Sequence, residues 1–260
     1  MNKATLFLLI ILSVMNLSAQ ELTVFVGHRG ASHLAPENTL ASYKLAWELR
    51  VEAAECDIML TEDKQVIVFH DKTGKRLTGQ NFKVKEAMYS DIKDYPIKLK
   101  ESNLPKYAGQ TIPLLSDLLQ IIPDGRTLVI EIKTGLEILP HMQKVIGEYW
   151  KSGNIAFIAF DFETIMATKK LYPDVPCYYL SAFNHDIKKK YDKIIKSDLD
   201  GVNLRHKIIS KELVQKFNNN NKGVWCWTVN DPSDAIQLIQ YGVTAITTDR
   251  PKWLKEAVNK

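Results

Sequence analysis

Residues 53–71 read AAECDIML-TEDKQ-VIVFHD, and this stretch decides the fold. Two apolar runs of β-favouring residues, 53–60 and 66–70, are separated by only five polar residues. Parallel neighbours need a crossover of about a dozen residues or more, so these two runs are predicted to form an antiparallel hairpin. With the turn centred between Asp63 and Lys64, we expect Asp57 to lie opposite His70.

Outside the hairpin, short apolar runs alternate with amphipathic segments. Strands are predicted at 22–28, 53–60, 66–70, 128–133, 155–160, 175–180, 201–204, 223–229 and 245–248, and helices at 39–50, 136–151, 162–171, 185–195, 211–221 and 232–240. Strands that alternate with helices indicate a parallel sheet, and setting aside the returning hairpin strand leaves eight. The predicted fold is therefore α/β, a TIM-type (β/α)8 barrel with a β-hairpin extension of strand two.

Residues 72–111 interrupt this alternation, with mixed polarity and few clean periods. We interpret them as a small insertion, or lid, above the barrel and not as a domain with its own core. The barrel domain is expected to span residues 20–260. Asn38 and Asp231 stand where helix N-caps are expected, and Pro232 follows at the first helical position.

The first nineteen residues have the pattern of a bacterial-type secretory signal peptide. One charge, Lys3, precedes an apolar run from Leu6 to Val14, and a small residue stands at Ala19. The apolar run is shorter than the roughly 20 residues that a membrane span needs. We expect cleavage after Ala19, export to the periplasm or the medium, and no stable membrane insertion of the mature chain; an uncleaved anchor is the alternative.

Composition and charge exclude several classes of protein. With 45% hydrophobic and 25% charged residues, the chain has the composition of a globular protein. Its net charge of +4 is small and evenly spread, which argues against a nucleic-acid partner. Cys56, Cys177 and Cys226 are too sparse for a disulfide framework or a zinc site, and we expect them to be buried. The residues leave open whether two of them pair.

Three carboxylates are expected at the mouth of the barrel. Alternate residues of a barrel strand face the interior, and sites form at the C-terminal ends of the strands. Glu55 and Asp57 share one face of strand two while Cys56 faces the helices, and Glu131 lies near the end of the 128–133 strand. Burying three carboxylates together is prohibitive unless a cation neutralises them. An all-oxygen ligand set predicts one hard divalent cation, Mg²⁺ or Ca²⁺.

Two histidines and two cationic side chains are predicted at the same mouth. His28 ends the first strand and His70 ends the returning hairpin strand, while Lys133 shares the face of Glu131. Two imidazoles can divide general acid and general base catalysis near neutral pH. Arg29 and Lys133 supply positive charge for an anionic group such as a phosphate. Beside a cation, this set of side chains suits phosphodiester cleavage.

Eight short motifs resemble glycerophosphodiester phosphodiesterases, keep the order of that family and span residues 26–251. They are His28-Arg29-Gly30, Pro36-Glu37-Asn38-Thr39, Glu55-x-Asp57, Val66-x-Val68-Phe69-His70-Asp71, Ile112-Pro113-Leu114-Leu115, Ile130-Glu131-Ile132-Lys133, Trp227-Thr228-Val229-Asn230 and Thr248-Asp249-Arg250-Pro251. Each motif alone is a weak signal, whereas the ordered set is specific.

The resemblance implies a TIM barrel with a small insertion after the second histidine. It also implies metal-dependent hydrolysis of glycerophosphodiesters, as small-molecule substrates, to glycerol phosphate and an alcohol. Carried over by position, His28 and His70 are the acid/base pair. The other implied roles are metal binding by Glu55, Asp57 and Glu131, phosphate contact by Arg29 and Lys133, support of the mouth from behind by Glu37 and Asn38, and a wall of the alcohol or glycerol pocket by Trp227.

Two segments depart from the family pattern. Residues 72–75 read KTGK where a Leu is usual, and Phe160 follows an Ala where a Ser is common. Both segments lie at the mouth or the insertion, so they bear on the substrate alcohol and leave the reaction class unchanged.

Two other functions are compatible with the same barrel. A phospholipase-D-like enzyme would act on intact lipids through attack by a substrate hydroxyl and release of a cyclic phosphate. Such an enzyme would need an exposed apolar rim for docking to a membrane, whereas segment 81–110 contains many charged residues among its aromatic ones. A non-catalytic phosphate-ligand binder would have lost a histidine or a metal carboxylate, and this chain retains all of them. The residues do not assign the metal, the head group, the acid and the base, or the oligomeric state.

Overall fold

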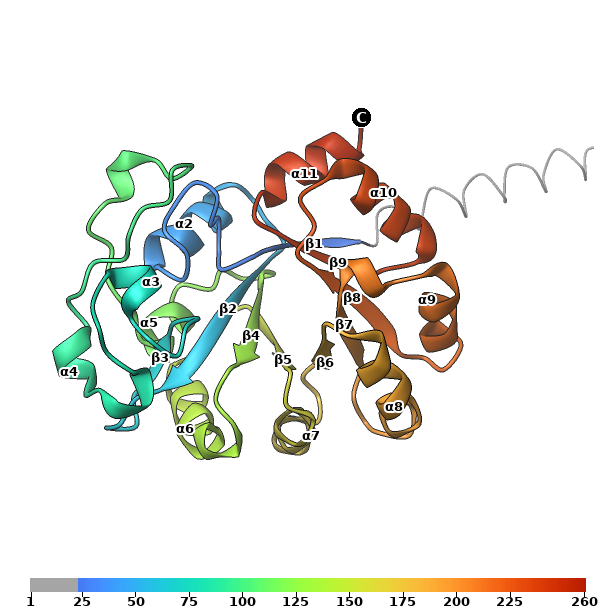
Figure 1. Ribbon diagram of the computed structural model, residues 1–260, viewed down its shortest axis with the longest axis horizontal. Helices are drawn as coiled ribbons and strands as arrows, with labels where there is room; N and C mark the ends of the chain where they lie inside the picture. Colours follow the sequence, from blue (N-terminus) through green and yellow to red (C-terminus); the bar gives the residue numbers. More distant parts are fainter. Residues whose placement is uncertain (1–22) are drawn as a thin grey trace, which may run out of the picture.

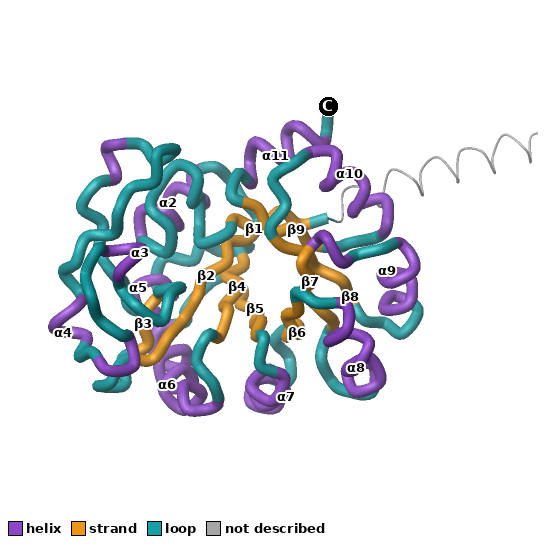
Figure 2. Tube along the Cα trace, in the orientation of Figure 1, coloured by secondary structure: helices purple, strands orange, loops and turns teal. Residues whose placement is uncertain are grey.

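Residues 23–260 are described by a computed structural model, in which eight parallel strands close into a barrel and a ninth strand is added to it (Figures 1 and 2). The strands are β1 (Val24–Gly27), β2 (Ala53–Leu60), β3 (Val66–Val68), β4 (Thr127–Ile132), β5 (Asn154–Ala159), β6 (Cys177–Ser181), β7 (Gly201–Arg205), β8 (Gly223–Trp227) and β9 (Ala245–Thr248). The eight barrel strands are ordered β1-β9-β8-β7-β6-β5-β4-β2, and β1 pairs with both β9 and β2, so the ring is closed. The predicted barrel is confirmed, while the predicted signal peptide lies outside the described residues.

Helices surround the ring of strands (Figure 2). The outer helices are α2 (Leu40–Glu48), α5 (Leu115–Leu119), α6 (Leu139–Tyr149), α7 (Phe162–Leu171), α8 (Asn184–Ile195), α9 (Lys211–Asn218), α10 (Pro232–Tyr241) and α11 (Pro251–Val258), with single turns η3 (Leu136–Ile138) and η4 (His206–Ile208) before α6 and α9. Asp231 caps α10 as predicted. The N-cap prediction for Asn38 is wrong, because the Thr39 hydroxyl accepts from the Ser42 N–H and caps α2.

The hairpin of β2 and β3 forms as predicted, but its register differs from the prediction by one residue. The paired residues are Ile58–Val68, Met59–Ile67 and Leu60–Val66. The N–H of Phe69 then donates to the carbonyl of Asp57 at 2.9 Å, so Phe69 and not His70 lies opposite Asp57.

The reason for this shift is the length of the turn. Thr61 and Gln65 close a loop of three residues, in which Lys64 adopts a left-handed φ of 62°. A three-residue hairpin loop with a left-handed last residue is a common alternative to the two-residue turn. Because β3 ends at Val68, His70 reaches the mouth from the segment that follows the strand.

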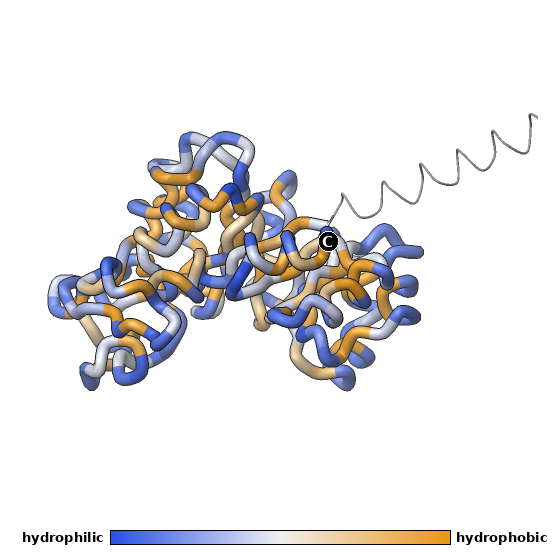
Figure 3. The backbone as a smooth tube through the Cα atoms, turned by 90° about the horizontal axis from the view of Figure 1, so that it is seen from above, coloured by the Kyte–Doolittle hydropathy of each residue, from blue (hydrophilic) through white to orange (hydrophobic). Residues whose placement is uncertain are grey.

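Two apolar layers hold the barrel together. The larger one lies between the strands and the outer helices and contains Cys56, Cys177 and Cys226, which are buried and, within residues 23–260, unpaired. The smaller one fills the barrel interior, where Tyr178 and Trp225 stack with ring centroids 3.9 Å apart. The segments at the periphery of the molecule are mostly hydrophilic (Figure 3).

Residues 72–111, hereafter the insertion, form a lobe at the left of the barrel in Figure 1. Its short helices are α3 (Lys75–Thr78), η1 (Val84–Glu86), α4 (Tyr89–Ile92) and η2 (Pro105–Tyr107). Apolar side chains of the insertion, including Leu77, Val84 and Ile92, pack with Met59 and Ile67 of the hairpin in one cluster. The insertion therefore shares its core with the hairpin.

Candidate active site

The predicted site residues converge on a cavity of about 200 Å³ at the C-terminal ends of the strands. Its lining consists of His28, Arg29, Glu55, His70, Glu131, Lys133, Ile158, Phe160, Leu180, Asn203, Trp227 and Thr247. The three other predicted residues, Glu37, Asn38 and Asp57, are buried behind this lining. No residue of the insertion is among those that line the cavity.

Glu55, Asp57 and Glu131 form a compact group, hereafter the carboxylate cluster, in which one oxygen of each lies within 4.8 Å of the others. The parallel pairing of β2 with β4 sets Asp57 directly beside Glu131. Within the described residues, the buried oxygens Glu55 Oε1 and Asp57 Oδ1 have no hydrogen-bond partner. Buried carboxylate oxygens without partners are costly, and a hard divalent cation with oxygen ligands would satisfy them.

The ionisation of the carboxylate cluster reflects its burial. Burial, followed by the charges of Asp57 and Glu131, raises the pKa of Glu55 well above its ordinary value. Burial and the Asp57 charge raise the pKa of Glu131 to about 7. Burial would also raise the pKa of Asp57, but Arg29 and Lys133 hold it below its ordinary value. Three acids thus face two cations, and a bound divalent cation would favour the ionised form of all three.

Arg29 reaches the carboxylate cluster with its backbone and its side chain. Its left-handed φ of 54° turns its N–H toward Glu55 Oε2 at 2.9 Å, and its Nε lies 3.2 Å from Asp57 Oδ2. Gly30 follows with φ 82°, where an added Cβ would lie 2.4 Å from Ser42 Oγ. The loop therefore requires glycine at this position.

Lys133 follows β4 and turns back onto the carboxylate cluster. Its Nζ lies 2.8 Å from Glu131 Oε1 and 3.5 Å from Asp57 Oδ1. Burial would lower the pKa of Lys133, but Glu131 and Asp57 raise it above its ordinary value. The lysine is therefore a cation at the edge of the cavity, at the position that the sequence predicts.

Asn38 supports the carboxylate cluster from behind. Its Nδ2 donates to Asp57 Oδ2 at 2.8 Å, and its Oδ1 accepts from the hydroxyl of Tyr43 at 2.7 Å. Asn38 has a positive φ of 58°, which turns it away from the capping position of α2 and toward β2. The buried Tyr43, on α2 and five residues after Asn38, was not predicted as part of the site.

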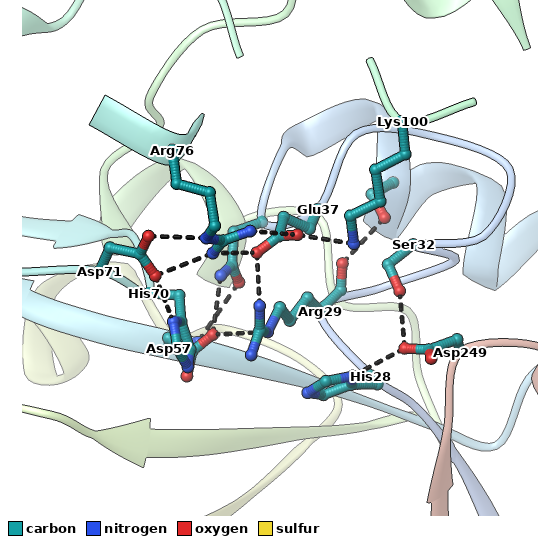
Figure 4. A network of polar contacts seen from close by, with 12 residues as sticks. His28, Arg29, Ser32, Glu37, Asp57, His70, Asp71, Arg76, Lys100 and Asp249 are labelled. Carbon is teal, nitrogen blue, oxygen red and sulfur yellow. Dashed lines mark hydrogen bonds and ion pairs between the residues drawn. The ribbon is translucent and has the colours of Figure 1, made fainter. Parts of the chain in front are cut away.

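Glu37 is a second buried acid, and only 1% of its side chain is exposed. It accepts hydrogen bonds from Arg29 of the barrel and from Arg76 of the insertion, and it pairs with Lys100 of the insertion at 2.6 Å. Burial would raise the pKa of Glu37, but these three cations hold it far below its ordinary value. Glu37 thus joins the barrel mouth to the insertion (Figure 4).

Each histidine is held by a carboxylate whose role the sequence reasoning missed (Figure 4). His28 Nδ1 lies 2.8 Å from Asp249 Oδ1, and His70 Nδ1 lies 2.6 Å from Asp71 Oδ1. A carboxylate at Nδ1 favours the tautomer with its proton on Nδ1 and leaves Nε2 for other partners. The sequence signals for these two partners were Asp71, directly after His70, and Asp249, directly after β9, the last strand, which pairs with β1.

The remaining wall of the cavity is largely apolar. The rings of Phe160 and Trp227 meet edge to face with centroids 5.6 Å apart. Asn203 and Thr247 add two buried polar side chains, and Asn203 Oδ1 has no partner within the described residues. Neither was predicted as a site residue, although both are polar residues on predicted strands.

The sequence profile described as the glycerophosphoryl diester phosphodiesterase family matches residues 28–253. The chain belongs to this family. The match covers every predicted site residue and confirms the resemblance that the motifs indicated. This phosphodiesterase is therefore an enzyme, a phosphoric diester hydrolase, and the non-catalytic alternative is set aside.

Similar proteins cover nearly the whole phosphodiesterase. A glycerophosphodiester phosphodiesterase of Caldanaerobacter subterraneus subsp. tengcongensis is 31% identical over 245 residues, which is 92% of this chain and 98% of the relative. A glycerophosphodiester phosphodiesterase of Bacillus subtilis is 28% identical over 257 residues, which is 91% and 86% of the two chains. The structure of an Oleispira antarctica phosphodiesterase in complex with the product sn-glycerol-3-phosphate aligns with a TM-score of 0.81 at 24% identity, covering 92% of this chain and 98% of that one, and it supports the barrel fold.

Proposed function

We propose that this enzyme hydrolyses glycerophosphodiesters to glycerol phosphate and an alcohol, with His28 and His70 as the acid/base pair beside a divalent cation. The observation that carries the proposal is the convergence, on one cavity, of two carboxylate-held histidines with the carboxylate cluster. The family supports this substrate class, and the Oleispira antarctica enzyme was solved with such a product.

In the proposed mechanism, the carboxylate cluster would hold Mg²⁺ or Ca²⁺. When bound, the cation supplies Lewis acidity that stabilises negative charge on the phosphoryl group. Arg29 and Lys133 lie at the edge of the carboxylate cluster, where they can bind the other phosphate oxygens. Burial in the barrel mouth strengthens these charge interactions relative to water.

The two histidines then move the protons. With Nδ1 of each ring at a carboxylate, Nε2 is the nitrogen left for the reaction. One imidazole accepts a proton from the attacking water as the water oxygen bonds to phosphorus. The other donates a proton to the alcohol oxygen as its bond to phosphorus breaks.

We place the organic part of the substrate against Phe160, Trp227 and Asn203. Replacing Asn203 by Leu is expected to raise KM about tenfold, because a buried amide that binds a substrate hydroxyl contributes roughly 1.5 kcal/mol. Steady-state kinetics on glycerophosphocholine measures this. Asn154→Leu is the matched control, because Asn154 is exposed at the start of β5, the end away from the cavity. An unchanged KM in Asn203→Leu would contradict this placement.

The reaction itself is tested with the purified mature protein and a panel of glycerophosphodiesters, with Mg²⁺, with Ca²⁺ and with chelator. Phosphorus NMR of the products is expected to show glycerol phosphate directly, without a cyclic phosphate. Absence of turnover on the whole panel, with either metal present, would refute the proposal.

A second candidate function, cleavage of intact lipids with a cyclic phosphate product, is favoured by one feature of the rim. Leu136, Phe160 and Phe183 follow three successive barrel strands, and they are 51%, 44% and 58% exposed. Exposed apolar side chains beside a mouth suit a lipid surface. Accumulation of a cyclic phosphate from lysophosphatidylcholine micelles, faster than from glycerophosphocholine, would favour this candidate.

We also propose that the protein is exported to the periplasm or the medium and cleaved after Ala19. Within residues 23–260, no helix is both long enough and apolar enough to span a bilayer. Intact-mass analysis of the protein from a bacterial host is expected to give a chain that begins at Gln20. A full-length chain in the membrane fraction would instead support the uncleaved anchor.

A further inference from the structure

Two chains of contacts lead from the insertion to the two histidines, and none of the residues that link them lines the cavity. Figure 4 shows the first chain, from Arg76 through Asp71 to His70. The first begins at Arg76 in α3. Its Nε and NH2 donate to the two oxygens of Asp71 at 2.7 and 2.8 Å, and Asp71 Oδ1 lies 2.6 Å from His70 Nδ1. The same guanidinium donates to both oxygens of Glu37 at 2.9 and 3.1 Å.

The Arg76 guanidinium, which donates to two carboxylates at once, has an electrostatic role. Asp71 and Glu37 are two acids that share one guanidinium, and bidentate arginine pairs hold a carboxylate in one orientation better than a point charge does. Since Asp71 is the Nδ1 partner of His70, the orientation of Asp71 decides the orientation of the imidazole. Arg76 therefore acts on His70 through Asp71 without reaching the cavity.

The second chain begins at Asn103, which is buried near the end of the insertion. Its Nδ2 donates to the carbonyls of Ser32, His33 and Ala35 at 3.0, 3.1 and 3.2 Å. The N–H of the neighbouring Leu104 donates to the carbonyl of Leu34, in the same loop, at 2.8 Å. One amide thus binds three carbonyls of the loop between β1 and α2.

That loop carries His28 and touches its partner. Ser32 Oγ donates to Asp249 Oδ1 at 3.3 Å, and the N–H of His33 donates to the Asp249 carbonyl at 3.3 Å. The same Asp249 oxygen lies 2.8 Å from His28 Nδ1. Asn103 therefore reaches His28 through Ser32 and Asp249.

We propose that the insertion is the element that positions both histidines: Arg76 acts on His70 through Asp71, and Asn103 acts on His28 through Ser32 and Asp249. Arg76 and Asn103 are positioning residues, not catalytic ones. The proposal rests on the proposed acid/base roles of His28 and His70, and it assigns to the insertion a role other than that of a lid.

The first test uses Arg76→Ala, Arg76→Lys and the control Lys85→Ala, whose side chain is exposed on the insertion. We expect Arg76→Ala to lower kcat about 10- to 100-fold with KM changed less than about twofold, as for a misplaced catalytic group. Arg76→Lys is expected to recover part of kcat, because lysine keeps the charge and loses the fork. Lys85→Ala is expected to behave as the wild type.

The tautomer of His70 separates positioning from a merely structural role. Two-bond ¹H–¹⁵N spectra of the imidazoles are expected to show one Nδ1–H tautomer for His70 in the wild type and a mixture in Arg76→Ala. The proposal is overturned if Arg76→Ala keeps a wild-type kcat, or if kcat, metal affinity and melting temperature fall together while the His70 spectrum is unchanged.

The second test addresses His28. Asn103→Ala is expected to broaden or mix the His28 tautomer signal and to lower kcat with KM nearly unchanged. Because Asn103→Ala can destabilise the loop, Ser32→Ala cuts the same chain one step later and removes only a hydroxyl. Ser90→Ala, an exposed serine of the insertion, is the matched control. A wild-type His28 spectrum in both Ser32→Ala and a folded Asn103→Ala would overturn this half.

These readouts also separate the proposal from the proposed function. If the wild type turns over no glycerophosphodiester, the proposed function fails, while the imidazole spectra still report whether the insertion orients the two rings. If the wild type is active and the variants leave both spectra and kcat unchanged, only the positioning proposal fails.

Discussion

Replacing either His28 or His70 by alanine is expected to lower kcat by about 10²- to 10⁴-fold, the usual contribution of a positioned acid or base. Both imidazoles line the cavity, each with its Nδ1 at a carboxylate, and both are partly exposed. Because 21% of the His28 side chain and 30% of the His70 side chain are exposed at the mouth, their removal opens no enclosed cavity in the core. The measurement is kcat on glycerophosphocholine with metal present, together with a thermal melt that shows that the barrel still folds.

The control is His141→Ala, which removes an imidazole from α6 beside the hairpin turn, away from the cavity. It is expected to keep the wild-type rate. The pH profile of kcat/KM adds a second readout, because loss of the base and loss of the acid remove different limbs of a bell-shaped profile. Near wild-type rates in His28→Ala or His70→Ala would show that the acid/base assignment is wrong.

Removal of divalent cations is expected to reduce turnover by about 10³-fold or more, since Lewis-acid stabilisation is worth several kcal/mol. Mg²⁺ or Ca²⁺ should restore the rate. The structural reason is the carboxylate cluster, in which the buried oxygens Glu55 Oε1 and Asp57 Oδ1 accept no hydrogen bond within the described residues. The experiment measures turnover after exhaustive chelation and again after each metal is added back.

The affinity for the metal should rise with pH between about 6 and 8. Burial and the Asp57 charge raise the pKa of Glu131 to about 7, and a metal binds the deprotonated carboxylate, so protons compete with it below that pH. Calorimetric titration at three pH values measures this. Glu131→Gln should weaken binding at every pH, whereas Glu137→Gln, at an exposed acid nearby, should not. Full activity after exhaustive chelation would contradict the metal assignment.

Much of the fold is predictable from the sequence because the signals that specify it are local. The period-two alternation of a strand places Glu55 and Asp57 on one face whatever surrounds them. The short link between 60 and 66 forces an antiparallel return, and strand-to-helix alternation leads to a barrel. His28, His70 and the carboxylate cluster were predictable at one mouth for the same reason, since all of them stand at or near strand ends.

Two predictions that depended on the backbone conformation of a single residue were wrong: the register of the hairpin and the N-cap of α2. The hairpin register differs by one residue from the prediction because Lys64 adopts a left-handed φ. Thr39 and not Asn38 caps α2, because Asn38 also adopts a left-handed φ. A single left-handed residue other than glycine costs about 1–2 kcal/mol and is fixed by its surroundings in the fold, so composition alone does not locate it.

By itself, then, the sequence determined the barrel, the hairpin and the acids and histidines of the mouth. Each of these follows from the two-residue period of a strand or from the position at which a strand ends. Only the tertiary structure decided what holds them. Asp249 meets His28 across 221 residues of sequence, and Arg76 and Asn103 contact Asp71 and Ser32 from an insertion that has no periodic signal. Such contacts arise when the ring closes between β1 and β9 and the insertion packs on the hairpin, and no local pattern encodes that closure.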